Sequence, residues 1–238
     1  ADYSLATKMA GSVEDVLGFL RRLAARSRSA AEHELAELQE FAGMQLEPWD
    51  ITFWLEKYKQ ARFSVSNEEL RQYFPSRTVI NGLFALAAKL YGVEFVELDD
   101  VEVWHKDARY FAIRNEADEV IGGFYADIYA RNGKRNGAWI DECIGRQNLN
   151  GQTSLPVGYL VCNFPPVDKD GLSLLTHDDV VTLFHEFGHM LHHLLTRIDL
   201  PSISGINGVP WDAVELPSQF MENFAWSYEV LRKCSAHP

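Results

Sequence analysis

The sequence of 238 residues has few cysteines, no long apolar run and no basic block. Its three cysteines (Cys143, Cys162 and Cys234) form no Cys-x-x-Cys pair, which argues against a disulfide framework and a cysteine-bound zinc. No stretch reaches the roughly 18 apolar residues of a membrane-spanning helix. The first ten residues lack the basic start and apolar run of a signal peptide. We therefore expect a cytoplasmic, reducing compartment and no membrane partner.

The charge is strongly acidic, with 34 acidic and 22 basic residues and a formal net charge of −12. Phosphates of nucleic acids and anionic lipids repel such a chain, so we expect no nucleic-acid partner. The apolar share of 47% and the charged share of 24% are ordinary for a globular protein with an ample core. The composition leaves the oligomeric state open.

The spacing of apolar residues divides the chain into three regions. Residues 1–92 carry them at helical spacing, residues 93–165 form strand-like runs, and residues 166–238 return to helical spacing. The order predicts a mainly α protein with a small β-sheet, an α+β fold. No linker supports a firm division into domains, so residues 1–238 are expected to form part of one domain.

Capping residues, glycines and prolines delimit the expected elements. Ser12 with Asp15 predicts the start of the first helix, and Gly43 a later stop. Aromatic residues of the first region are expected in the core. The basic residues Arg131, Lys134 and Arg135 are expected in a solvated loop, with carboxylate binding as the alternative. The expected helices cover residues 13–24, 30–41, 49–58, 66–74 and 79–91, and the expected strands 94–98, 109–114, 120–129 and 157–164, with a hairpin connection at 115–118.

Residues 185–189 read His-Glu-Phe-Gly-His, the H-E-x-x-H signature of zinc peptidases. A helix from about 177 to 197 is predicted around the motif, with Thr176 and Asp179 as a capping box. His185 and His189, four residues apart, then share one face and can bind one ion. Glu186 lies about 100° around the helix from His185, a position suited to a metal-bound water. The alternative is a pair of stacked histidines without a metal.

A catalytic zinc takes three protein ligands and keeps one position open. His192 lies seven residues from His185, about 10 Å along a helix, so both cannot bind the same ion. We expect His192 and His193 to support the site or to pack in the core. Glu215, Glu222 and Glu229 are spaced by seven on a helix predicted to begin near Pro217 and to end near residue 231. Spacing alone leaves all three carboxylates open as the third ligand.

The motif and the downstream segment 215–223, Glu-Leu-Pro-Ser-Gln-Phe-Met-Glu-Asn, together resemble the thimet oligopeptidase family of zinc peptidases. Segments 3–9, 137–139 and 208–215 are similar to members of the same family. The resemblance implies a zincin-like catalytic core with H-E-x-x-H on a long helix. It also implies one zinc ion bound by His185, His189 and Glu215, with Glu186 as the catalytic carboxylate. We expect Glu222 to lie beside the ligands and to support them.

The resulting functional prediction is a zinc-dependent endopeptidase that hydrolyses short peptides through a zinc-activated water. Gly137, Ala138 and Trp139 are expected on a sheet edge near the metal, where an extended substrate could pair. The alternative is a non-catalytic zinc-binding fragment. Family members are longer, and their transition-state-stabilising tyrosine and histidine residues lie beyond Pro238. We therefore expect a fragment that binds zinc and, taken alone, cleaves peptides poorly.

Overall fold

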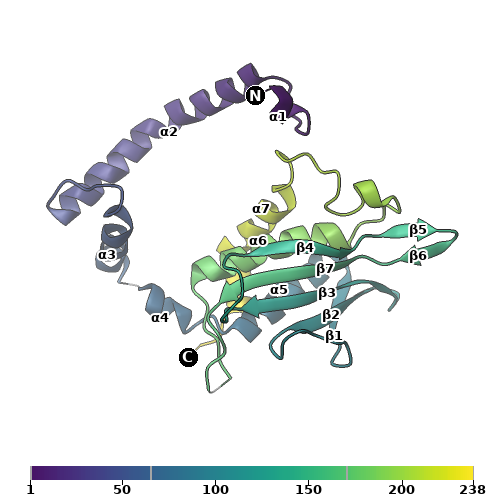
Figure 1. The fold of residues 1–238 in the computed structure, drawn as a ribbon. Helices are drawn as coiled ribbons and strands as arrows, with labels where there is room; N and C mark the ends of the chain where they lie inside the picture. Colours follow the sequence, from purple (N-terminus) through teal and green to yellow (C-terminus); the bar gives the residue numbers. More distant parts are fainter. Residues whose placement is uncertain (1, 65, 170, 238) are drawn as a thin grey trace. The chain divides into compact units, whose positions relative to one another are not determined.

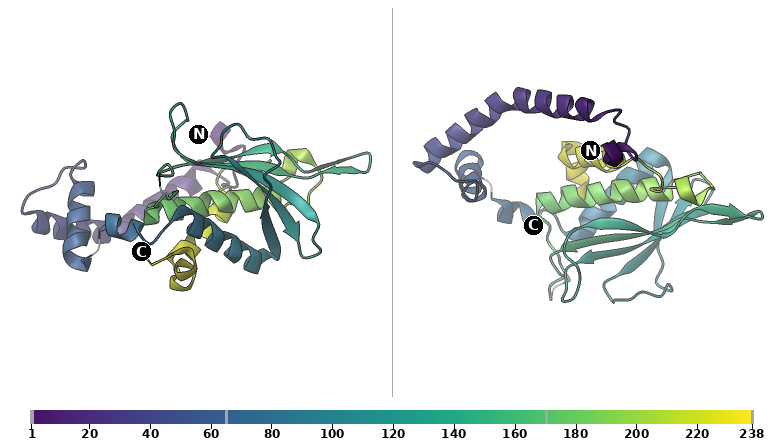
Figure 2. Two further views of the ribbon diagram at one scale, coloured as in Figure 1. Left: turned by 90° about the horizontal axis from the view of Figure 1, so that it is seen from below. Right: turned by 45° about the horizontal axis from the view of Figure 1, so that its top comes forward.

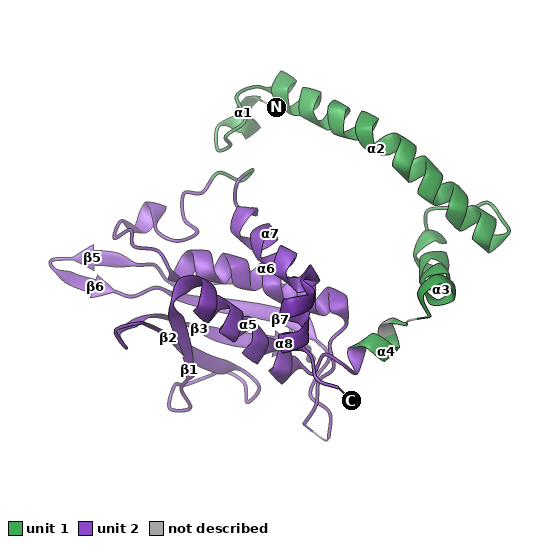
Figure 3. Ribbon diagram, turned by 180° about the vertical axis from the view of Figure 1, so that it is seen from behind, with its two compact units in different colours: residues 1–70, 210–212 green, residues 71–209, 213–238 purple. Residues whose placement is uncertain are grey.

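A computed structural model describes residues 2–64, 66–169 and 171–237. The chain forms two compact units, which Figure 3 distinguishes by colour. Unit 1 comprises Ala1–Leu70 with Pro210–Asp212, and unit 2 comprises Arg71–Val209 with Ala213–Pro238. In the described ranges, every helix is too short or too polar to cross a membrane.

Unit 1 is helical, with α1 (Asp2–Leu5), α2 (Val13–Ala42), α3 (Ile51–Phe63) and most of α4 (Asn67–Arg71). The predicted cap of α2 is confirmed, because the Ser12 side chain accepts a hydrogen bond from the Asp15 amide at 3.1 Å. Gly43 ends α2 with a φ of 69°, a left-handed conformation that glycine adopts readily.

Two expectations for unit 1 are wrong. Helix α2 is continuous where two helices were expected, since residues 25–29 contain no glycine or proline to interrupt it. Several aromatic side chains expected in the core are exposed, including Trp49 at 78% and Phe53 at 59%. Only part of the aromatic set packs within the unit: Phe41 contacts Trp54 and Tyr58 edge-on.

Unit 2 is built on a five-stranded sheet (Figure 1) with the order β1-β2-β3-β7-β4. β3 and β7 are parallel, and the other neighbours are antiparallel. The predicted strands at residues 120–129 and 157–164 are confirmed, and Asn115 begins the predicted hairpin connection. The strands are β1 (Val93–Glu97), β2 (Arg109–Asn115), β3 (Val120–Tyr129), β4 (Trp139–Ile144) and β7 (Val157–Phe164).

A separate hairpin was not predicted. It pairs β5 (Gln147–Leu149) with β6 (Gln152–Ser154). Its strands consist mostly of polar, exposed residues, so they carry no alternation of apolar and polar side chains. The turn at Asn150 and Gly151, both with positive φ, is the local feature that closes this hairpin.

The core lies where helices α5 (Ser76–Tyr91) and α6 (His177–Leu194) pack on one face of the sheet (Figure 2). Phe124 on β3 and Phe184 and Phe187 on α6 are each 0% exposed. The other face carries a separate aromatic group, in which Tyr125 stacks on Tyr159 with ring centroids 5.5 Å apart. Helix α6 therefore lies on one face of the sheet, and the tyrosine pair lies on the other.

The C-terminal helical region is broken into three pieces, so the prediction of one helix from Pro217 to about residue 231 is wrong. α7 (Leu216–Glu222) is followed by the 3₁₀ helix η2 (Asn223–Trp226) and by α8 (Tyr228–Cys234). Ser227, between η2 and α8, is extended with a ψ of 122°. Glu229 consequently lies on a different helix from Glu222 and does not share its face.

The prediction of a solvated basic loop after β3 is wrong in part. The Lys134 side chain is 5% exposed, and its Nζ lies 2.9 Å from Asp127 Oδ1. Arg131 binds the same carboxylate at 2.6 Å. Both side chains bind the Asp127 carboxylate of β3, whereas Arg135 is exposed. The alternative, a role of this loop in binding the carboxylate of a ligand, stays a prediction.

Candidate metal centre

Helix α6 presents the histidines of the H-E-x-x-H motif. Its predicted capping box is confirmed: the Asp179 amide donates to Thr176 Oγ1 at 3.1 Å, and the Thr176 amide donates to Asp179 Oδ2 at 2.8 Å. The helix ends at Leu194, three residues before the predicted end, and Thr196 Oγ1 then accepts the amide of Ile198. Such a local side-chain bond competes with continuation of a helix.

A close crossing brings α7 to the histidines of α6. A Cβ atom on Gly188 would lie 2.5 Å from the Pro217 carbonyl oxygen and 2.7 Å from Ser218 Cα. Only glycine admits the main chain of α7 at this distance. Glu215 immediately precedes α7. The glycine between the two histidines therefore allows the carboxylate of Glu215 to approach them.

His185, His189 and Glu215 form the one group of three or more possible metal ligands found among the described residues. Glu215 Oε2 lies 3.2 Å from His185 Nε2 and 3.0 Å from His189 Nε2. Tetrahedral ligands about 2.1 Å from a zinc ion are separated by about 3.4 Å. Two imidazoles and one carboxylate are also the donor types of catalytic zinc sites that keep a fourth position open. The residues present therefore fit one zinc ion.

Neighbouring polar groups orient two of these ligands. Glu222 Oε1 lies 2.5 Å from His185 Nδ1. A carboxylate only accepts, so Nδ1 carries the proton and Nε2 presents its lone pair to the ligand cluster. Ser218 Oγ donates to Glu215 Oε2 at 2.8 Å. The sequence placed Glu222 beside the ligands, whereas Ser218 was missed; its only signal is the i, i+3 spacing from Glu215.

The charge states agree with metal binding. Burial lowers the pKa of His189, against an opposing effect of Glu215, which favours the neutral imidazole that a metal needs. For Glu215, burial would raise the pKa, but the Ser218 hydrogen bond and the two histidines outweigh it and lower the pKa. The carboxylate is therefore held in its anionic form.

Glu186 has a different environment from Glu215. The residue is 7% exposed and is not part of the ligand group. Burial raises the pKa of its carboxyl group, and the charge of Glu215 adds to the effect, while His185 opposes it. A carboxylate whose pKa is raised toward neutrality is a better proton acceptor at working pH than an exposed one.

The two histidines that follow the motif stand outside the ligand group. His193 is 0% exposed, and its Nε2 lies 3.1 Å from the Val157 carbonyl oxygen of β7. His192 Nδ1 has no hydrogen-bond partner within the described part of the chain, and burial lowers the pKa of its ring. Any support that His192 gives to the metal stays a prediction.

The segment Gly137, Ala138 and Trp139 leads into an edge strand. Trp139 is the first residue of β4, which pairs only with β7 in the five-stranded sheet. Ala138 packs against the core cluster to which α6 contributes. Pairing of this edge with a peptide stays a prediction.

Comparison with known proteins gives a consistent result along the whole chain. Peptidase family M3 matches residues 1–238. The chain is 51% identical over 240 residues to oligopeptidase A of Escherichia coli strain K12, covering 98% of this chain and 35% of that protein. It is 32% identical over 256 residues to saccharolysin of Saccharomyces cerevisiae, covering 100% of this chain and 36% of that protein. The chain thus spans about a third of the length of the curated relatives it matches, and it belongs to peptidase family M3.

Proposed function

We propose that the chain is the metal-binding part of a zinc-dependent endopeptidase that cleaves short peptides. The convergence of His185 Nε2, His189 Nε2 and Glu215 Oε2 carries the proposal. Membership of peptidase family M3 and the similarity to oligopeptidase A support it. The three cysteines are free, which agrees with work in a reducing compartment such as the cytoplasm.

His185, His189 and Glu215 would hold the ion, and Glu222 keeps His185 in the tautomer that binds through Nε2. When bound, zinc supplies a Lewis acid that polarises the peptide carbonyl and lowers the pKa of a water to about 7. Glu186 accepts a proton as the water oxygen bonds to the carbonyl carbon. It then delivers this proton to the amide nitrogen as the carbon–nitrogen bond breaks.

The free side of β4 would hold the substrate. An edge strand exposes unpaired amide and carbonyl groups, and an extended peptide can add to it as a further strand. Main-chain pairing depends little on side chains and therefore suits a peptidase that accepts many short sequences. A zincin-like core, with the motif helix packed on a sheet and the substrate on its edge, is the arrangement that we propose.

The test uses the full-length protein that contains this chain, loaded with zinc, and a short quenched fluorescent peptide. Glu186→Gln should retain the metal and lose about 10²–10⁴-fold in turnover, the scale of general base catalysis. Glu229→Gln, on the exposed face of α8, is the matched control and should retain full turnover. Wild-type turnover in Glu186→Gln would refute the role of Glu186. A zinc-loaded wild-type protein without turnover would favour the non-catalytic alternative.

A further inference from the structure

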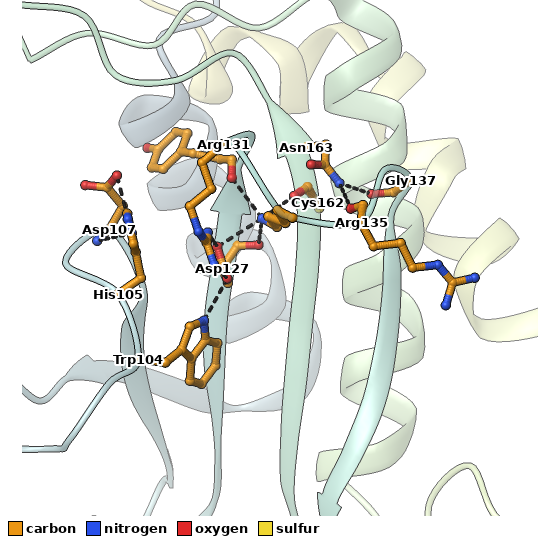
Figure 4. Close-up of polar contacts among 11 residues, drawn as sticks. Trp104, His105, Asp107, Asp127, Arg131, Arg135, Gly137, Cys162 and Asn163 are labelled. Atoms are coloured by element: carbon orange, nitrogen blue, oxygen red, sulfur yellow. Dashed lines mark hydrogen bonds and ion pairs between the residues drawn. The ribbon is translucent and has the colours of Figure 1, made fainter.

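A buried anion lies on the sheet face opposite α6, near the end of β3. Asp127 accepts hydrogen bonds from Trp104 Nε1 at 2.9 Å, from both terminal nitrogens of Arg131 at 2.6 and 2.7 Å, and from Lys134 Nζ at 2.9 Å (Figure 4). Burial alone would raise the pKa of this carboxyl group, but the donors outweigh burial and hold the pKa far below its ordinary value. Asp127 is therefore a fixed negative charge with both oxygens occupied.

Lys134 pairs with the Asp127 carboxylate and also contacts main-chain carbonyls of two neighbouring strands. Its Nζ lies 2.8 Å from the Asp127 carbonyl oxygen, 2.9 Å from that of Tyr129 and 2.6 Å from that of Cys162. Asp127 and Tyr129 end β3, and Cys162 lies on the parallel neighbour β7. The register between these strands shifts between Asp127 and Tyr129. The ammonium group therefore binds main-chain carbonyls at an irregular end of the sheet.

A second set of contacts holds the segment between β3 and β4 just before β4 begins. Asn163 Nδ2, from β7, donates to the carbonyl oxygens of Arg135 at 2.8 Å and of Gly137 at 2.7 Å. The Arg135 guanidinium lies over the Trp139 ring, 5.5 Å from its centroid. The segment between β3 and β4 is thus attached to the sheet at Lys134, Arg135 and Gly137, within a few residues of the start of β4 (Figure 4).

We propose that Lys134 and Asp127 are positioning residues for peptide binding, which they support by fixing the backbone of residues 137–139 where β4 begins. This inference rests on the proposed function, in which the free side of β4 pairs with the substrate. β4 has one neighbour in the sheet, β7, so its place depends on that ladder and on the segment leading into it. A backbone that aligns another strand must itself be held, because strand addition depends on the alignment of main-chain amide and carbonyl groups.

The experiment compares Lys134→Met with Arg109→Met in the zinc-loaded, full-length Glu186→Gln protein, in which a bound peptide is not cleaved. Arg109 on β2 binds Glu97 on β1, so its loss also removes an ion pair, but at the opposite edge of the sheet. Two quantities are measured: the Kd of a short peptide and amide hydrogen exchange in residues 137–144. Neither requires turnover, so failure of the inference can be told from failure of the catalytic proposal.

We expect Lys134→Met to raise the peptide Kd by about tenfold, the scale of one or two lost main-chain hydrogen bonds, and to accelerate exchange in residues 137–144, with zinc content unchanged. Arg109→Met should leave the peptide Kd and the amide exchange in residues 137–144 unchanged. Asn163→Ala removes the second attachment without burying a charge, and it should act in the same direction if Lys134→Met fails to fold. An unchanged Kd, or exchange that rises equally throughout the sheet, would overturn the proposal.

Discussion

Replacement of Gly188 by alanine should separate zinc binding from folding. The added Cβ would lie 2.5 Å from the Pro217 carbonyl oxygen and 2.7 Å from Ser218 Cα. Ordinary contacts begin near 3.4 Å, and main-chain atoms cannot rotate away, so α7 has to retreat by about 1 Å. Such overpacking costs about 1–3 kcal/mol, while alanine in place of glycine inside a helix returns about 1 kcal/mol. The net loss in the free energy of unfolding is therefore only about 0–2 kcal/mol.

The effect on the metal should be much larger than the effect on stability. Glu215 directly precedes α7, so a retreat of α7 carries its carboxylate away from His185 and His189. Metal–ligand distances tolerate only about 0.2 Å. Changes that merely misorient a ligand already lower metal affinity by 10–100-fold, and we expect a loss near the upper end of this range.

The assay is competition for zinc against a chelating dye, together with thermal unfolding of the metal-free protein. Gly18→Ala is the matched control, because Gly18 lies in α2 and its Cβ would meet only the end of the Arg22 side chain, at 3.4 Å. The control should keep the zinc affinity of the wild type. Gly188→Ala with unchanged zinc affinity would refute the argument that this crossing places Glu215.

Two further predictions concern the carboxylates around the site and the sheet. Glu222→Gln should lower zinc affinity by about 10–100-fold, measured by the same competition, because the amide is a weaker partner for His185 Nδ1; an unchanged affinity would contradict the orienting role. Asp127 has a folded pKa below its unfolded value, so its charge stabilises the protein above about pH 4 and this contribution is lost as the pH falls further. Asp127→Asn should therefore lower the free energy of unfolding, measured by urea unfolding, by about 2 kcal/mol at pH 7 and by less at pH 3. An equal loss at pH 7 and pH 3 would contradict the lowered pKa of Asp127.

The sequence predicted those parts of the fold that depend on local patterns. Capping side chains such as Ser12 and Thr176 mark helix starts through bonds within four residues, and β3 and β7 carry dense runs of strand-forming residues. The histidine pair needs only the period of one helix. These features are decided by neighbours along the chain, so they can be inferred without tertiary contacts.

Features that depend on distant partners were missed or left open. Spacing could not choose among Glu215, Glu222 and Glu229, because the approach of the Glu215 carboxylate to the two histidines depends on the crossing of α7 over Gly188. Lys134 lies in a polar segment after a strand, which predicts an exposed side chain. Its neighbours in the sequence do not indicate that the ammonium group contacts Asp127 and the carbonyls of two strands. The break between η2 and α8 at Ser227 was likewise not predicted, because no proline or glycine marks it in the sequence.

Zinc titration of wild-type protein, Glu215→Ala and Glu222→Ala tests the central claim most directly. We expect one ion per wild-type chain, because His185, His189 and Glu215 converge in one group. Removal of a ligand should weaken binding by more than the 10–100-fold expected for a supporting residue, so Glu215→Ala should lose more affinity than Glu222→Ala. Full zinc retention in Glu215→Ala, with loss of zinc in Glu222→Ala, would contradict the account.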